Sequence, residues 1–439
     1  MNEHTREIVA RYRRWNFWMC VGNGALSIGG MSFFAAETVL AGLAYRLTGS
    51  AVHVGLLTSF VAIGWQWPQL LVGSLVEHRP RKMPIYTGAA VCRVLALVAM
   101  AAAVAFWRGA PGAKYWVVLL LAGAFTSFGG MSVVSFLDVT AKAVPATERP
   151  MLFSYRRLFS GLVGFFAGGA VVRLLDEGSG LPYPQNYAVC ILLGAVLCAA
   201  GYAMFISVRE PIEPVPPDRA PFAQFLMRGL MLFKRDADYR RFYLLSWAWA
   251  VAAMSQPLLV PYAMREFNAP GSLLGWFTAA IMLVAGISSY AWGRLMRRYG
   301  EPAAFMIAAL LLLFSPLTAL ALALLRPLDG VSAVLARHYV WPFLFMFACG
   351  TTAINGHLIT RMVYLLSLPP AHLRATYVAF MNTLTIPLLC APVAAGKLAD
   401  GVSYAAAFGT SAAAALCAFG LSATLRTRPA PSDSRCVGA

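Results

Sequence analysis

Apolar segments long enough to cross a bilayer recur along the whole chain, and short polar loops separate them. A helix rises about 1.5 Å per residue, so crossing the hydrocarbon core takes roughly 20 apolar residues. The pattern predicts twelve membrane-spanning helices. Their ranges are 15–45, 52–76, 83–107, 115–144, 151–176, 184–208, 240–265, 271–296, 302–326, 338–367, 373–400 and 402–425.

The longest polar stretch runs from Arg209 to Arg241 and divides the apolar segments into two groups of six. Its first half is rich in proline, which cannot continue a helix. Its second half places phenylalanine and leucine on one helical face, which predicts a short amphipathic helix on the membrane surface. The predicted parts are an N-terminal bundle (1–208), a cytoplasmic linker (209–239), a C-terminal bundle (240–425) and a cytoplasmic tail (426–439).

The composition supports lipid as the solvent of this chain, because 59% of its 439 residues are hydrophobic and only 12% are charged. The net charge of +17 could indicate a nucleic-acid ligand. The basic residues lie in short loops between apolar spans, however, so we expect no nucleic acid partner. The eight cysteines lack the spacing of metal ligands, and we expect no metal and no cofactor.

Basic residues are concentrated in the loops on one side of the predicted spans. The positive-inside rule assigns that side to the cytoplasm, and an even number of spans then places both termini there. The first span is too long for a signal sequence, so it is read as an uncleaved helix. We expect a multi-pass, monomeric protein of the bacterial inner (plasma) membrane, in contact with the lipid bilayer.

Corresponding loops of the two halves have related sequences. GSLVEHRPRK (73–82) follows the second span, and GRLMRRYGEP (293–302) follows the eighth. VPATERP (144–150) follows the fourth span, and LPPAHLRA (368–375) follows the tenth. Such pairs predict a duplicated six-helix unit.

The first of these loops has the pattern Gly73-x-Leu75-x-Glu77-His78-x-Pro80-Arg81-Lys82. It resembles the loop signature of the major facilitator superfamily, with histidine and proline in place of an arginine and a glycine. The second copy is weaker, because Arg297 replaces the acid. The resemblance implies an all-α integral membrane fold of twelve helices in two pseudo-symmetric bundles. It also implies a secondary transporter rather than an enzyme, with helices one, four, seven and ten around the central cavity.

The resemblance further implies a gating latch at the cytoplasmic face. Gly73 would let the second helix approach the eleventh, and Glu77 would face a helix amino terminus. Arg81 would pair with Asp138. Apart from the resemblance, Arg93 lies at a similar depth to Asp138 and Arg156 is close on the next helix, so Asp138 could form a neutralising cluster with Arg81, Arg93 or Arg156. Asp138 is thus either a structural member of the latch or a proton carrier, and the loop could instead serve only to set topology.

Ionisable residues within the spans are costly unless paired or hydrated, so each is a functional candidate. Glu37 lies about 20 residues into the first span, where removal from water favours its protonated form. In proton-coupled exporters of the superfamily, an acid on the first helix often carries the coupling proton. Glu37 could also be hydrated at the outer interface or paired with Arg46.

His357 and Arg361 are four residues apart and so share one face of the tenth helix. They could bind an anionic group of a substrate, or Arg361 could extend to the membrane surface. Other polar residues within spans could contact a substrate, or could form hydrogen bonds between helices. These residues are Gln66, Gln256, Asn355 and Asn382.

The fifth span contains Ser160-x-x-x-Gly164-Phe165-x-x-Gly168-Gly169, which resembles the antiporter signature of the superfamily's drug exporters. The eleventh span has small residues at the matching place, from Ala391 to Gly396. Both segments predict close packing between the bundles. The expected function is proton-coupled export of a hydrophobic or amphipathic small molecule. The alternatives are uptake of an anionic metabolite with protons, or a non-transporting sensor.

Overall fold

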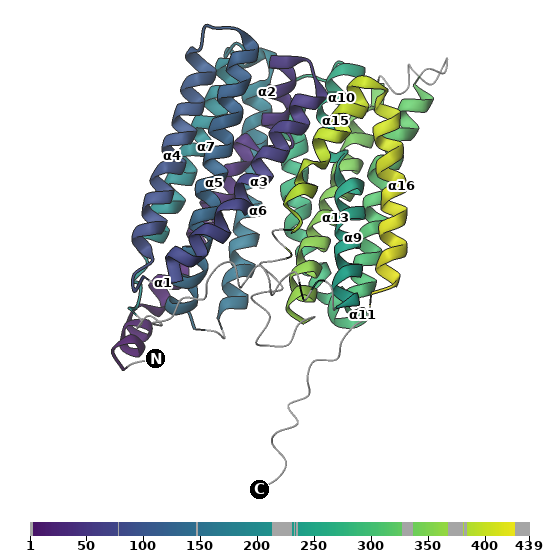
Figure 1. The fold of residues 1–439 in the computed structure, drawn as a ribbon. Coiled ribbons are helices and arrows are strands. Elements are labelled where there is room, and N and C mark those ends of the chain that lie inside the picture. The colour runs from purple at the N-terminus through teal and green to yellow at the C-terminus, as the bar shows by residue number, and fades with distance from the viewer. Residues whose placement is uncertain are drawn as a thin grey trace.

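The computed structural model is helical throughout the part of the chain that it describes, with no strand in that part (Figure 1). It describes residues 3–77, 79–145, 148–212, 231, 233, 236–326, 337–367, 381 and 384–425. Nine helical segments of these residues are long and apolar enough to cross a membrane. Each of the twelve predicted spans overlaps a helix, while the predicted surface helix and the tail lie outside the described residues, apart from positions 231 and 233.

In the N-terminal half, α1 packs against α6 and α7, and α5 packs against α3 and α4. These helices expose apolar side chains on several sides, as expected of helices that face both protein and lipid. The elements are α1 (Glu3–Gly30), η1 (Met31–Phe34), α2 (Val39–Thr48), α3 (Ala51–Glu77), α4 (Met83–Phe106), α5 (Pro111–Ala143), α6 (Arg149–Leu175), η2 (Glu177–Ser179) and α7 (Gln185–Ile206).

In the C-terminal half, α11 packs against α13 and α16, and α9 packs against α16. The elements are α9 (Ala237–Ala253), η3 (Gln256–Leu258), α10 (Leu259–Glu266), α11 (Leu273–Leu325), α13 (Val340–Ser367), η5 (Ile386–Cys390), α15 (Ala391–Gly401) and α16 (Tyr404–Ala423). Two predicted spans fall within α11, which is interrupted at Gly300 (φ 78°, ψ 174°). Positive φ favours glycine, so the turn between the two spans is built around this residue.

The first span of each half is broken near its middle. The sequence predicts one membrane span over 15–45, and the structure has a span over Ala10–Thr48, but its helix is interrupted, because α1 ends at Gly30 and α2 begins only at Val39. The break follows two consecutive glycines, which disfavour helix. The seventh span breaks in the same way at η3, which contains Pro257. Both breaks bring backbone out of the regular helix at the centre of the protein.

The α6–α11 pair forms one of the two most extensive contacts between the halves. A Cβ atom on Gly168 would lie 2.7 Å from the backbone nitrogen of Ala279, and one on Gly275 would lie 2.3 Å from that of Val172. Backbones this close admit no larger side chain. The close packing predicted for the fifth span is confirmed here.

The α3–α15 pair forms the second of these extensive contacts and is built in the same way. A Cβ on Gly55 would lie 2.2 Å from the carbonyl oxygen of Pro392, and one on Gly396 would lie 2.6 Å from that of Ala51. The small residues from Ala391 to Gly396 therefore also pack between the halves, as predicted.

Hydrogen bonds between the halves add to this packing at the end opposite the start of α1, where α2, α10 and α15 lie (Figure 1). The Asp400 carboxylate at the end of α15 accepts from Ser50 Oγ (2.6 Å) and from the backbone N–H groups of Ala51 and Val52 (both 3.1 Å). An acid of one half thus caps the first helix turn of the other, where free N–H groups favour negative charge.

Candidate functional site

A cavity of about 270 Å³ lies between the two halves, and we call it the polar cavity because its mainly apolar wall also carries charged and amide side chains. Five of the residues predicted from the sequence line it together, and they come from both halves. They are Glu37, Gln66, Gln256, His357 and Arg361. The remaining polar side chains of its wall are Thr58, Ser246 and Thr385, and Trp249 is its aromatic member.

His357 and Arg361 form the cationic part of this wall. The buried imidazole of His357 stacks on the Trp249 ring, with 3.9 Å between ring centroids and 9° between planes. Its Nδ1 atom has no hydrogen-bonding partner within the described part of the chain. Arg361, one helical turn further, donates to Thr385 Oγ1 (3.3 Å). Buried polar atoms are normally satisfied, and this nitrogen has no accessible surface in the structure, so a ligand reaches it only if a neighbouring side chain moves.

Glu37 lies in the break between η1 and α2 and belongs to the part of the wall that the N-terminal half contributes. Its side chain is accessible from the cavity although it lies deep within the protein. No ion pair or hydrogen bond to its carboxylate is found among the residues that the structure describes. The alternative pairing with Arg46 is wrong, because the Arg46 guanidinium lies over the rings of Tyr183 and Tyr187. The carboxylate can therefore exchange a proton or contact a ligand.

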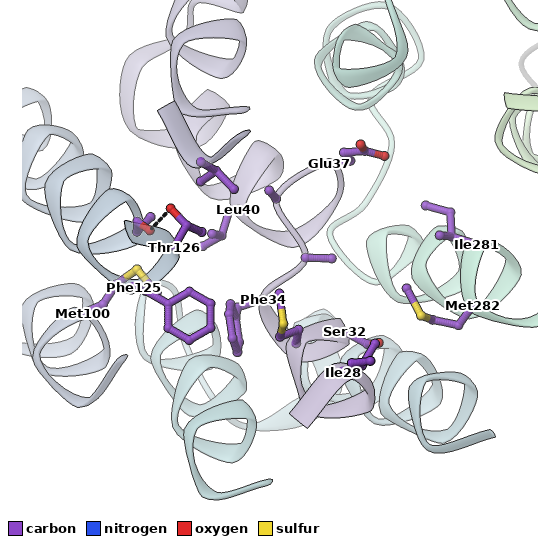
Figure 2. A pocket seen from close by; sticks show the side chains of 15 residues that line it. Ile28, Ser32, Phe34, Glu37, Leu40, Met100, Phe125, Thr126, Ile281 and Met282 are labelled. Atoms are coloured by element: carbon purple, nitrogen blue, oxygen red, sulfur yellow. Dashed lines mark hydrogen bonds between the residues drawn. The ribbon is translucent and has the colours of Figure 1, made fainter. Parts of the chain in front are cut away.

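A second cavity, of about 310 Å³, adjoins the same acid. Figure 2 shows its wall of apolar side chains, with Glu37 at the edge and the carboxylate turned away from them. Met100 and Phe125 come from the N-terminal half, and Ile281 and Met282 come from α11. An apolar cavity and a polar cavity thus share Glu37, an arrangement that suits an amphipathic ligand.

Asn355 lies outside both cavities, so the prediction that it contacts a substrate is not supported by its position. Its amide nitrogen donates to Ser288 Oγ (3.0 Å) and Ser289 Oγ (2.9 Å), and its oxygen accepts from Arg157 (3.1 Å). It is two residues from His357, so the two side chains leave α13 in different directions. The other predicted contact, Asn382, lies outside the described residues.

The predicted latch partner of Asp138 is wrong. Asp138 pairs with Lys82 (3.1 Å) and Lys142 (2.7 Å), whereas Arg81 is exposed. The physical reason is that α4 begins at Met83. The residue just before the helix, Lys82, is therefore the one directed toward Asp138 on α5, and Arg81 is not. The surroundings of Gly73 and Glu77, both in α3, lie outside the described residues.

Arg93 is buried but does not join Asp138, so the predicted charge cluster is wrong. Its guanidinium lies over three aromatic rings, 4.4 Å from the centroid of Phe125, 4.7 Å from Tyr202 and 5.1 Å from Trp65. Because aromatic faces attract cations, these three rings stabilise the buried Arg93 guanidinium in place of the carboxylate that was expected to pair with it.

Three contributing residues were missed by the sequence analysis. Thr385 binds Arg361, Glu210 accepts from the first backbone N–H groups of α4, and Asp400 caps α3. The role of Asp400 could have been considered from the sequence, since it is an acid at the end of a predicted span, where it can reach the N-terminus of a neighbouring helix. Thr385 had none, because a threonine in an apolar span is common.

Two repeated helical halves that enclose a polar cavity define a class of membrane protein, the carriers that work by alternating access. The sequence identifies the family, because the Major Facilitator Superfamily model matches residues 23–385. The chain belongs to this superfamily and is a secondary transporter, not an enzyme. No curated protein sequence matches it.

Solved transporters share its fold. The nucleoside transporter NupG is 13% identical (TM-score 0.61) and aligns with 93% of this chain and 98% of its own. A POT family transporter in complex with 5-aminolevulinic acid is 10% identical (TM-score 0.65; 93% and 94%). The xylose transporter XylE from E. coli, in a partially occluded inward open conformation, is 12% identical (TM-score 0.63; 92% and 98%). At these identities the similarity concerns the fold alone.

Proposed function

We propose that this transporter exports a small amphipathic molecule in exchange for protons. The observation that carries the proposal is the position of Glu37, which lines both the apolar and the polar cavity. It would act as a monomer in the bacterial inner membrane, with both termini in the cytoplasm. The small-residue face of α6 and the acid in the first span favour export, through the family resemblance of both features.

Exchange follows from competition at one carboxylate. A ligand whose apolar part fills the cavity beside Met100 and Phe125 brings its polar head to Glu37. A cationic group in that head binds the ionised carboxylate, and protonation of Glu37 removes the attraction. The proton and the ligand therefore occupy the site in turn, as antiport requires.

The test is Glu37→Gln, which keeps the shape of the side chain and removes its charge. We expect it to abolish proton-driven transport in proteoliposomes while substrate exchange without a gradient persists in part. Asp138→Asn is the comparison, since Asp138 is paired with two lysines and is proposed as a structural acid rather than a proton carrier. Unchanged pumping by Glu37→Gln would remove the coupling assignment.

A second candidate, uptake of an anionic metabolite with protons, is favoured by His357 and Arg361 in the same cavity. The two candidates differ in the sign of one effect. Removing the negative charge at Glu37 weakens the binding of a cationic head but strengthens the binding of an anion near Arg361. Binding titrations of Glu37→Gln with simple cationic and anionic amphipaths distinguish them. If the native protein in proteoliposomes transports no substrate under a proton gradient, the result would instead indicate a non-transporting sensor.

A further inference from the structure

A third cavity, of about 770 Å³, lies outside the polar site, in the groove between α6 and α11. Its wall includes the exposed apolar side chains Leu158, Phe166 and Ile287. On a chain that spans a membrane, exposed apolar side chains in the middle of helices face lipid. The groove is therefore open to the hydrocarbon of the bilayer.

The groove adjoins the central site, because two residues each line two neighbouring cavities. Met282 lines both the groove and the apolar cavity, and Glu37 lines both the apolar and the polar cavity. Met282 packs over a backbone without a side chain, since a Cβ on Gly164 would lie 2.6 Å from its Cγ. A flexible, unbranched side chain is thus the wall between the bilayer and the interior, and it can move without displacing a helix.

The charges along this route are complementary to a head that carries both signs. Arg157 lies at the groove, and the central cavity holds Arg361 on one half and Glu37 on the other. A cavity that receives an acid from one half and a base from the other suits a zwitterion, with its anionic group near Arg361 and its cationic group near Glu37.

From this arrangement of adjoining cavities and charges we infer that the substrate is a single-chain amphipath with a zwitterionic head, and that it enters sideways from the bilayer past Met282. The inference rests on the proposed function and names its substrate class. The apolar chain would pass from the groove into the cavity beside Met100 and Phe125, and the head would follow to Glu37 and Arg361.

Gly286→Trp tests the route, because a Cβ on Gly286 meets no heavy atom within 4 Å and the larger side chain would fill the groove. The matched control is Gly169→Trp, an exposed α6 glycine with equal space that does not line the groove. The probes are a fluorescent single-chain phosphocholine in the vesicle membrane and glycerophosphocholine, which has the same head without a chain and arrives through water.

In proteoliposomes we expect Gly286→Trp to slow transport of the single-chain phosphocholine by about tenfold or more, with glycerophosphocholine binding unchanged and the control like the native protein. Retained glycerophosphocholine binding also shows that the variant is folded. Undiminished phosphocholine transport would mean that the groove only contacts annular lipid. Equal losses for both probes would also overturn the route, since a blocked side entrance spares a ligand from water.

Failure of the proposed function would look different. Gly286→Trp would still slow transport of the single-chain phosphocholine and spare glycerophosphocholine binding. Glu37→Gln, however, would leave proton-driven transport intact. Conversely, a native protein that exchanges protons for glycerophosphocholine but ignores the single-chain probe would overturn this inference and leave the proposed function standing.

Discussion

The two walls of the central site differ in chemistry. The N-terminal half contributes an apolar surface around Phe125 and the acid Glu37, which has no ion-pair partner in the described part of the chain. The C-terminal half contributes His357 and Arg361, both held by neighbouring side chains, the indole of Trp249 and the hydroxyl of Thr385. A fixed base recognises a ligand, whereas a free acid can change its protonation. Under the proposed function, recognition and proton coupling are divided between the two halves.

The largest effect on binding is expected at the C-terminal wall. Arg361→Ala should weaken the binding of a head with an anionic group on the order of a hundredfold, because a charge-assisted contact in a buried cavity is lost. Arg361→Lys, which keeps the charge but not the planar fork, should lie between this variant and the native protein. Titration calorimetry in detergent measures both. Equal affinity of all three proteins would contradict recognition by this wall.

The next largest effect is expected at the α6–α11 contact between the two halves. Gly168→Val inserts a side chain where the Ala279 backbone leaves no space, and should cost about 1–3 kcal/mol as well as transport. Gly169→Val is the neighbouring control, because a Cβ there meets open space. Thermal unfolding and transport rates should separate the two variants. Similar behaviour would mean that the α6–α11 contact is not tightly fitted.

A smaller, selective effect is expected at the N-terminal wall. Val61→Phe places a larger side chain in the wall of the apolar cavity and so reduces its free volume. It should weaken the binding of a chain-bearing amphipath roughly tenfold. A ligand with the same head and no chain should bind as it does to the native protein. If both ligands lose affinity equally, the apolar cavity does not hold the chain.

The smallest effect concerns the ion pair at Asp138. Lys82→Met removes one of its partners and should lower stability by about 0.5 kcal/mol, because the pair is partly exposed. Arg81→Met, one residue earlier and exposed, should change nothing measurable. Chemical denaturation of both variants tests the assignment. The reverse order would restore Arg81 as the partner.

The sequence predicted much of this architecture because hydropathy and helical periodicity are local properties. They placed the spans, and the four-residue spacing of His357 and Arg361 put both on the face that lines the cavity. The same spacing rule, applied to Asn355 and His357, would have placed Asn355 on another face.

Tertiary contacts explain the remaining differences. The break before Glu37 lies in a continuously apolar span and could not be located from hydropathy. The choice of Lys82 over Arg81 depends on where α4 begins, and the aromatic surroundings of Arg93 come from three separate helices. Neither is encoded in nearby sequence.

The central claim is that the polar head of the substrate and a proton compete for Glu37. Proton release on ligand binding, measured in weakly buffered solution with glycerophosphocholine, tests it most directly. At a pH where Glu37 is protonated in the free protein, the account predicts release of about one proton per bound ligand, and none from Glu37→Gln. The same release from both proteins, or none from the native protein at any pH, would contradict it.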